Sequence, residues 1–187
     1  MKKILIGSLS LVIALAAYFG FSYFNKSENT AVLEKYGLDG LSVIEMVNAL
    51  DSRTDEPAGL SVSITPTTLK LYDNDKEFDF DLPKDQFYVS FAPYINQTHP
   101  CTQHNLVFCR SELVNQVMHV TITKTDGTVL LDEDKTTMAN GFIGLWLPKN
   151  IEGTLKVDYN NLTVTIPLTT NDTSDTCITT PLQLKAA

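Results

Sequence analysis

The spacing of apolar residues changes twice along this chain of 187 residues. Residues 4–24 form an uncharged and almost wholly apolar run, residues 31–52 carry apolar positions three or four apart, and from Leu60 onward apolar and polar residues alternate. The first spacing is typical of amphipathic helices, and alternation is typical of strands with one buried face. The pattern predicts an α+β protein with an apolar segment over residues 1–24, a helical segment over residues 31–52 and a β-rich domain over residues 60–187.

The helical segment contains its own start signal. Glu45 follows Ser42 at the spacing of a capping box, in which each side chain bonds the other residue's backbone N–H. The apolar stripe that follows consists of Val43, Ile44, Val47 and Leu50. Short helices cannot bury such a stripe alone, so it must pack on the β-rich domain or on another subunit. We predict a homodimer formed through residues 31–52.

The β-rich region consists of short alternating segments separated by turn residues. Dipeptides typical of tight turns occur at Asp126-Gly127, Asn140-Gly141 and Asn160-Asn161. Many short strands at this spacing predict an antiparallel β-sandwich-like domain. A dinucleotide-binding fingerprint, a P-loop, a nucleophile elbow and an HExxH motif are all absent from the sequence, which argues against the commonest classes of enzyme.

The apolar start is typical of an export signal, because Met1-Lys2-Lys3 provides a short basic region before it. Two interpretations stay open. The tripeptide over residues 14–16 could serve as a cleavage site, whereas about 20 apolar residues are enough for an uncleaved membrane anchor. We favour cleavage. In both cases the two lysines stay in the cytoplasm and the rest of the chain crosses the membrane, so the working domain is predicted to be extracytoplasmic.

The net charge argues against a nucleic-acid partner. Residues 1–16 contain two of the fourteen basic residues and none of the twenty-two acidic ones, which leaves the exported part with a charge of −10. Such a polyanion is repelled by nucleic acid and by anionic lipid, and the sequence contains no clustered basic stripe. We predict no nucleic-acid binding.

The candidate chemistry lies mainly in residues 98–109, which hold two of the three histidines and two of the three cysteines. In an oxidising compartment, three cysteines predict one disulfide and one remaining thiol. Loop-closure entropy gives about 2.6 kcal/mol for a Cys101–Cys109 bridge and about 4.4 kcal/mol for a Cys109–Cys177 bridge. Stability alone therefore favours a long-range bridge.

Two functional hypotheses compete with a purely structural disulfide. If all three thiols converge, they form a soft trigonal set that suits Cu(I), whereas Zn²⁺ would prefer a fourth ligand such as His99 or His104. A thiol oxidoreductase is the other hypothesis, and the lack of a CxxC motif before a helix argues against it. The residues by themselves leave these alternatives open.

Three stretches of the sequence resemble a known family. Residues 87–109, 140–157 and 176–184 are similar, in their order and in the placing of the cysteines, to the CueP-type periplasmic copper-binding proteins of bacteria. The similarity extends from about Val32 to Lys185, and the long apolar start is the one departure. The resemblance implies a periplasmic protein, released or tethered to the inner membrane, with a helical portion that pairs two subunits and a β-rich domain that holds copper.

The resemblance also implies a ligand set and partners. The metal ligands would be Cys101, Cys109 and Cys177, with His104 as the nearest imidazole. The cargo would be copper as Cu(I), arriving as Cu(II) and reduced by two of the thiols. A periplasmic thiol reductase would restore these thiols, and an exported cuproenzyme such as Cu,Zn superoxide dismutase would receive the copper. We do not class such stoichiometric reduction as enzymatic. A zinc-binding module and a disulfide-stabilised β-sandwich interaction module are the alternatives.

Other polar and sulfur-containing residues are weaker candidates. His99 precedes Pro100 and is as consistent with an extended loop residue as with a ligand. His119 falls at a strand position and is predicted to lie on the surface or to be partly packed. Met118 and Trp146 are predicted to be core residues.

Overall fold

The structure is a computed structural model that describes residues 28–186. The chain divides into two compact units, residues 1–41 and residues 42–187. The described part of the first unit is helical over residues 28–35 and turns at Gly37, which has a φ of 69°. The predicted signal peptide or anchor over residues 1–24 lies outside the described residues. No helix among residues 28–186 is long and apolar enough to cross a membrane.

The second unit begins with helix α2 (Val43–Asp51), which starts where the capping box predicted. The Ser42 backbone N–H donates to Glu45 Oε2 over 2.8 Å, and the Glu45 backbone N–H donates to Ser42 Oγ over 3.4 Å. Val47 and Leu50 on the apolar stripe have no exposed surface. The chain itself therefore covers the inner part of this stripe, and the predicted homodimer stays a prediction.

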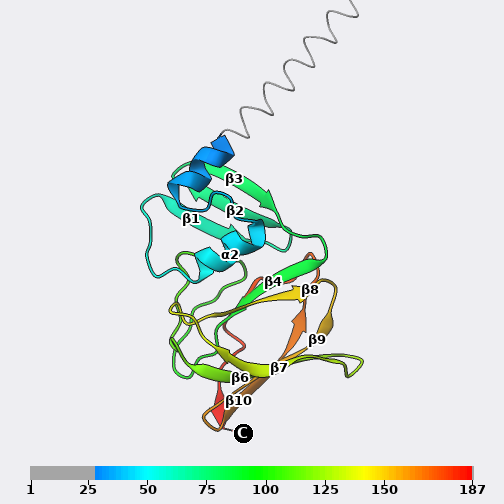
Figure 1. Ribbon diagram of the computed structural model, residues 1–187. Helices are drawn as coiled ribbons and strands as arrows, with labels where there is room; N and C mark the ends of the chain where they lie inside the picture. The colour runs from blue at the N-terminus through cyan, green and yellow to red at the C-terminus, as the bar shows by residue number, and fades with distance from the viewer. Residues whose placement is uncertain (1–27, 187) are drawn as a thin grey trace, which may run out of the picture. The chain divides into compact units, whose positions relative to one another are not determined.

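Twelve short strands follow in the described residues and form three sheets (Figure 1). The first sheet has the order β3-β2-β1-β5 and is antiparallel throughout. Its strands are β1 (Leu60–Ile64), β2 (Thr68–Asp73), β3 (Lys76–Asp81) and β5 (His104–Asn105). Strand β5 lies inside the cysteine-containing stretch, and its pairing with β1 fixes His104 opposite Ile64.

The other two sheets have orders β11-β4-β8 and β12-β10-β9-β6-β7. The smaller sheet consists of β4 (Gln86–Phe91), β8 (Ile143–Pro148) and β11 (Cys177–Ile178). The larger sheet consists of β6 (Val117–Lys124), β7 (Val129–Thr136), β9 (Glu152–Tyr159), β10 (Leu162–Thr169) and β12 (Lys185–Ala186). Strand β11 runs parallel to β4, with Cys177 opposite Ser90, and every other strand pair is antiparallel.

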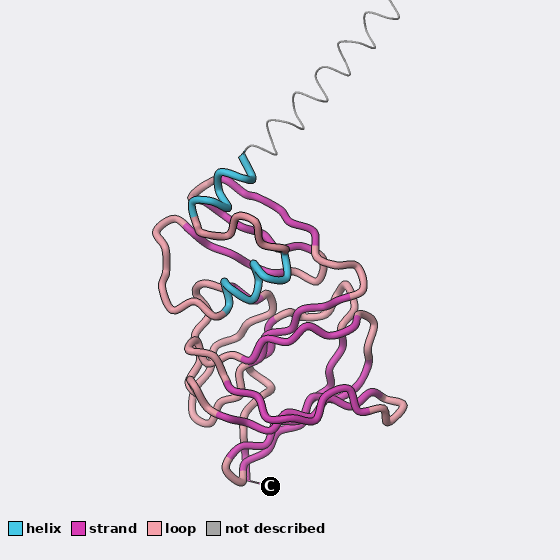
Figure 2. Tube along the Cα trace, in the orientation of Figure 1, coloured by secondary structure: helices cyan, strands magenta, loops and turns pink. Residues whose placement is uncertain are grey.

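The main hydrophobic core is built from strands of two sheets, β11-β4-β8 and β12-β10-β9-β6-β7. Phe87 and Phe91 of β4 pack in one cluster with Val120 and Ile122 of β6 and with Leu155 of β9. Alternate residues of each strand enter this core, which is the arrangement that alternation in the sequence predicts. The predicted α+β fold class, with an N-terminal helical segment followed by mostly antiparallel sheets, is confirmed (Figure 2).

The turn predictions are also confirmed. Gly127 and Gly141 have φ values of 86° and 84°, and Asn160 and Asn161 have values of 48° and 64°. These left-handed conformations favour glycine and asparagine. Gly141 has a further reason to lack a side chain, because a Cβ there would lie 2.8 Å from the carbonyl oxygen of Ser111.

Candidate metal site

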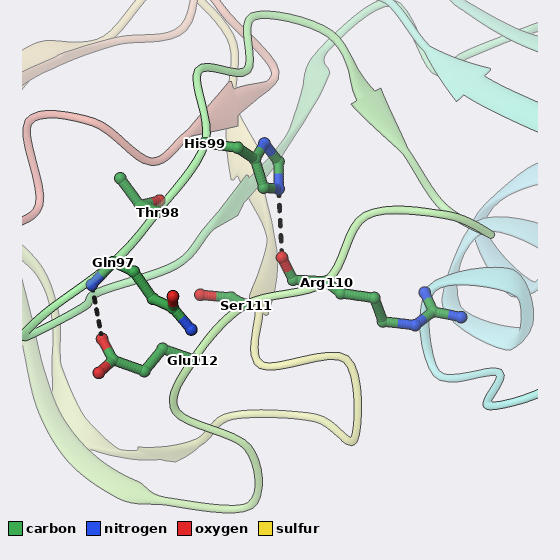
Figure 3. A pocket seen from close by; sticks show the side chains of 6 residues that line it. All are labelled: Gln97, Thr98, His99, Arg110, Ser111 and Glu112. Atoms are coloured by element: carbon green, nitrogen blue, oxygen red, sulfur yellow. Dashed lines mark hydrogen bonds between the residues drawn. The ribbon is translucent and has the colours of Figure 1, made fainter.

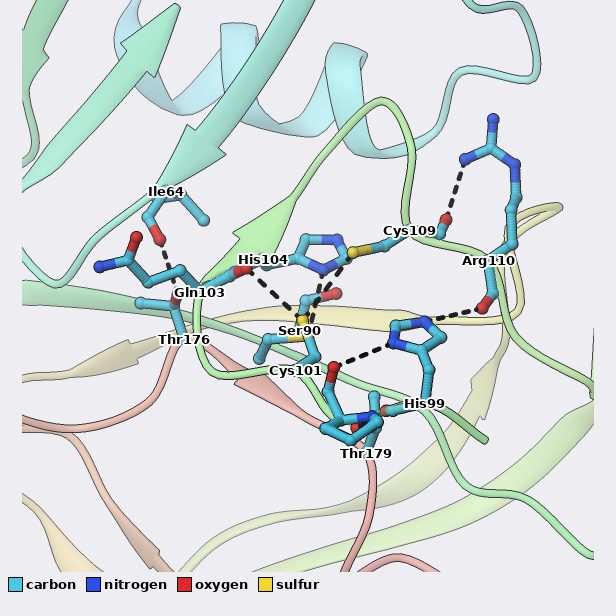
Figure 4. Close-up of a disulfide and its surroundings, with 12 residues drawn as sticks. Ile64, Ser90, His99, Cys101, Gln103, His104, Cys109, Arg110, Thr176 and Thr179 are labelled. Carbon is cyan, nitrogen blue, oxygen red and sulfur yellow. Dashed lines mark hydrogen bonds between the residues drawn. A yellow bond between two sulfur atoms is a disulfide. The ribbon is translucent and has the colours of Figure 1, made fainter. Parts of the chain in front are cut away.

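Two segments far apart in the sequence supply the three cysteines, and Figure 4 shows Cys101 and Cys109 with His104. Cys101 lies in the loop after β4, Cys109 follows β5, and Cys177 begins β11. The backbone N–H groups of Thr176 and Cys177 donate to the carbonyl oxygen of Thr102 over 3.0 and 3.2 Å. Strand β11 is thus hydrogen-bonded on one side to β4 and on the other to the loop that contains Cys101.

Cys101 and Cys177 form a disulfide that spans 76 positions of the sequence, with Cα atoms 5.5 Å apart. The bridge is long-range, as loop-closure entropy favours, and a loop of this length corresponds to about 4.5 kcal/mol. Cys109 keeps a free, buried thiol. Its Sγ lies 3.9 Å from Sγ of Cys101, so the remaining thiol is in contact with the disulfide.

His104 completes this cluster. Its ring is fully buried, and its Nδ1 lies 3.6 Å from Sγ of Cys177. The possible ligand atoms of His104 and the three cysteines all lie within 4.8 Å of one another. Phe142 packs beside the imidazole with ring centroids 4.7 Å apart. The four residues that the resemblance assigns to a metal site are therefore brought together in one place.

The other ring nitrogen of His104 contacts a residue that the sequence did not suggest. His104 Nε2 lies 2.7 Å from Oδ1 of Asp51, the last residue of α2. Asp51 has no exposed surface. The one signal in the sequence is its position four residues after Val47, which places a carboxylate on the apolar stripe of the helix.

Asp51 accepts hydrogen bonds from three further side chains. The hydroxyl groups of Tyr88 and Ser90 donate to Oδ2, the latter over 3.2 Å. The Asn140 amide donates to Oδ1 over 2.9 Å and to the Asp51 backbone carbonyl over 2.8 Å. All of these partners are buried. The carboxylate is therefore fully hydrogen-bonded, which is the condition for holding a charge inside a protein.

This environment changes the protonation of His104. Burial lowers the pKa of the imidazole, but the charge of Asp51, its hydrogen bond and, to a smaller extent, Cys109 raise it, and the resulting pKa is about 9. Burial also raises the pKa of Tyr88, and the neighbouring Asp51 carboxylate adds to that rise. At neutral pH the disulfide form therefore holds a protonated imidazolium beside Asp51.

The other two histidines lie apart from the cysteine cluster. His99 lines a surface pocket with Gln97 and Glu112, and its Nε2 lies 3.1 Å from the carbonyl oxygen of Arg110 (Figure 3). The remaining pocket residues are Thr98, Arg110 and Ser111. His119 is on β6, where Asp132 and Asp134 each lie 2.9 Å from one ring nitrogen. Its side chain is 44% exposed, so the prediction of a surface position is confirmed.

Of the two residues predicted to lie in the core, one is buried and the other is only partly buried. Met118 is 1% exposed and belongs to the main core, as predicted. Trp146 is only partly buried, and its indole N–H donates to Asn48 Oδ1 over 3.1 Å, so the prediction of a core tryptophan is wrong. Trp146 follows a buried leucine in strand β8, and alternation along the strand places it on the opposite face.

The arrangement can hold a soft metal ion. In the reduced state it offers three sulfur atoms and one imidazole nitrogen, and thiolates with imidazole suit Cu(I) and Zn²⁺ rather than Mg²⁺ or Ca²⁺. In the disulfide state only the Cys109 thiol and the His104 imidazole remain as ligands, and His104 binds a metal only after Nδ1 has lost its proton. The oxidation state of Cys101 and Cys177 therefore determines how many sulfur ligands the site provides.

Comparisons with known proteins agree on one family. The family described as "Periplasmic copper-binding protein CueP" matches residues 44–183. A solved structure, "Crystal Structure of S.CueP", is 41% identical, covers 84% of this chain and 97% of that chain, and superposes with a TM-score of 0.80. The search of curated proteins finds no match. The chain belongs to the CueP family of periplasmic copper-binding proteins.

Proposed function

We propose that this protein holds Cu(I) in the periplasm through Cys101, Cys109 and Cys177, with His104 as an additional ligand. The single observation that carries the proposal is the convergence of three sulfur atoms and one imidazole nitrogen within 4.8 Å of one another. Three of these residues are buried, so a bound ion would be shielded from water and from oxidants. Membership of a copper-binding family supports the choice of copper.

The two cysteines that can form the disulfide give the site a second role in their reduced state, the reduction of incoming Cu(II). When Cys101 and Cys177 form their disulfide, the two thiolates release two electrons, and these reduce two Cu(II) ions to two Cu(I) ions. Cys109 and His104 can retain one of these ions, and the other must pass to another carrier. Each such event consumes the two thiols, so the reduction is stoichiometric unless they are regenerated.

Regeneration requires an external thiol reductase, and the exposure of the sulfur atoms indicates where it acts. Cys101 is partly exposed, whereas Cys177 is 1% exposed. Thiol–disulfide exchange needs access to the attacked sulfur. An incoming thiolate would therefore attack Cys101 and release Cys177. An exported cuproenzyme such as Cu,Zn superoxide dismutase is the recipient that we propose for the Cu(I), on the strength of the family resemblance.

Zinc binding is the second candidate, because His104 Nδ1 turns toward the sulfur atoms and could provide the fourth ligand of a tetrahedral site. A purely structural disulfide is a weaker explanation. The free thiol of Cys109 lies 3.9 Å from Cys101, whereas an unrelated spare cysteine has no reason to contact the bridge.

Metal analysis with thiol counting separates these functions. Protein reduced and kept anaerobic should contain three titratable thiols, bind one Cu(I) per chain and retain it against a zinc excess. Mild oxidation should leave one titratable thiol. Retention of zinc in preference to copper, or no metal stoichiometry in the reduced protein, would contradict the proposal.

The homodimer and the mode of export are separate proposals. Deleting residues 31–52 would also remove Asp51, so the dimer is better tested by Ile44→Glu, at a partly exposed position of α2. A dimer through this segment should dissociate, and light scattering would then report the monomer mass.

Mass spectrometry of native material decides between cleavage near Ala17 and an anchor that retains Met1.

A further inference from the structure

Asp51 is the one fully buried carboxylate among residues 28–186. Burying a carboxylate costs several kcal/mol even after relaxation, and well-packed apolar residues often replace buried ion pairs without loss of stability. The fold nevertheless surrounds this carboxylate with donors on every side: His104 and Asn140 at Oδ1, and Tyr88 and Ser90 at Oδ2. Such an arrangement is better explained by what the carboxylate does for His104 than by stability.

The contact between Asp51 and His104 determines which imidazole nitrogen can bind a metal. A carboxylate only accepts hydrogen bonds, so the nitrogen that faces it, Nε2, must carry the hydrogen. In the neutral ring the lone pair then resides on Nδ1. Nδ1 is the nitrogen that lies 3.6 Å from Sγ of Cys177. Asp51 therefore fixes the tautomer that presents a lone pair to the sulfur atoms.

The same contacts fix the position of the carboxylate itself. Tyr88 and Ser90 are both on β4, the strand that pairs with Cys177. A Cβ at Gly144 would clash with the Tyr88 hydroxyl and lie 3.0 Å from Asp51 Oδ2, so the neighbouring strand β8 leaves room for these groups. One strand thus positions a sulfur ligand and the donors that orient the carboxylate.

We propose that Asp51 is a positioning residue of the copper site. Its carboxylate holds the His104 imidazole with Nε2 protonated and Nδ1 directed at Cu(I), and it places a fixed negative charge next to the ligand of a monovalent cation. Histidine ligands of metals usually donate their other N–H to such an acceptor, and mutation of the acceptor residue typically weakens metal binding about 10- to 100-fold. This inference rests on the proposed function.

The test is Asp51→Asn in the full chain. The asparagine oxygen can still accept from His104 and Asn140, and its amide can donate to the hydroxyl oxygens of Tyr88 and Ser90. The substitution therefore keeps the hydrogen bonds and removes the charge. We expect Cu(I) affinity of the reduced protein, measured by competition with a chromophoric Cu(I) chelator, to fall about 10-fold.

Asp134→Asn is the matched control, because it makes the same carboxylate-to-amide change beside His119, which does not belong to the cysteine cluster. We expect the Cu(I) affinity of this variant to change by less than about 2-fold. The fluorescence of Trp146, the only tryptophan in the chain, reports folding in every variant. This ring lies 5.0 Å from that of Tyr88 and is hydrogen-bonded to α2, so it senses the packing around Asp51.

A double variant distinguishes an effect of Asp51 through His104 from a general effect on the fold. His104→Gln removes the imidazole ligand, and its amide can still donate to Asp51. If Asp51 acts through His104, adding Asp51→Asn to His104→Gln should leave Cu(I) affinity within about 2-fold of the His104→Gln protein. An equal loss in both backgrounds would overturn the proposal.

Nitrogen NMR of the Cu(I)-bound wild-type protein gives a direct signature. We expect a protonated Nε2 and a metal-bound Nδ1 at His104, and the opposite assignment would also overturn the proposal. Unchanged affinity in Asp51→Asn, with a weakened His104→Gln, would overturn the role of the Asp51 charge and leave the proposed function intact. Unchanged affinity in His104→Gln and in the cysteine variants would instead reject the proposed ligand set.

Discussion

Two histidines of this protein, His104 and His119, are each hydrogen-bonded to carboxylates, and their surroundings differ. His104 is fully buried, contacts one carboxylate through Nε2 and directs Nδ1 at the cysteines. His119 lies on the surface of β6, and its two nitrogens are both occupied by Asp132 and Asp134. A histidine with one nitrogen held and the other directed at soft donors can act as a ligand. A histidine held through both nitrogens in water is only part of a charged surface.

Removing a sulfur ligand beside His104 should have the largest effect. Cys177→Ser removes a sulfur atom that lies 3.6 Å from Nδ1 of His104, and we expect it to lower Cu(I) affinity at least as much as Cys101→Ser does. Both variants also lose the disulfide, so their oxidised forms should be equally destabilised, by about 2–5 kcal/mol. Chelator competition and urea unfolding measure the two effects separately. A Cys177→Ser protein with unchanged affinity for one Cu(I) would show that the site is the local loop alone.

The sequence predicted this ligand set through the family resemblance, but it did not predict the residues that position His104. The capping box at Ser42 and Glu45 and the turns are local features, so their short patterns are sufficient. The contact between Asp51 and His104 joins residues 53 positions apart, and it depends on how α2 packs and on the pairing of β5 with β1. One sequence without tertiary contacts does not contain that information.

The disulfide pairing was unpredictable for a related reason. Loop entropy distinguishes long loops from short ones, but it hardly separates Cys101 from Cys109 as the partner of Cys177. The choice depends on the hydrogen bonds that hold Thr176 and Cys177 against Thr102, next to Cys101. These hydrogen bonds depend on how β11 packs, and no sequence motif predicts them.

Loss of the carboxylate should also distinguish the two histidines in stability. Asp51→Leu would leave the buried donors of His104, Tyr88 and Asn140 without their acceptor, and breaking a buried pair typically costs about 3–5 kcal/mol. The matched change at the surface, Asp134→Leu, leaves His119 free to bond water and should have little effect. Urea unfolding of the two oxidised variants compares the free energies. Equal stabilities would mean that water enters the site around His104.

The next largest effect should be the pH dependence of stability that His104 gives to the oxidised protein. The folded-state pKa of His104 is about 9, above that of an unfolded imidazole at about 6.5. The His104–Asp51 pair therefore stabilises the oxidised protein fully below about pH 6.5, and this contribution should be lost as the pH rises through 9. Unfolding of wild type and His104→Gln across this range measures the difference, which should shrink with rising pH. A difference that stays constant or grows would contradict a protonated His104 in the folded state.

The smallest effect should come from removing His119. Hydrogen bonds that the ring donates to Asp134 and to Asp132 raise the pKa of this imidazole, so its ion pairs also weaken as the pH rises. The ring is exposed, however, and water and salt screen these pairs. His119→Ala should leave the Cu(I) affinity of the reduced protein within about 2-fold of wild type, because no cysteine is near the ring and distant sites act independently. The same chelator competition provides the measurement, with His104→Gln as the variant that should weaken binding. If His119→Ala weakened Cu(I) binding as much as His104→Gln, burial and a free nitrogen directed at sulfur would no longer explain which histidine serves the metal.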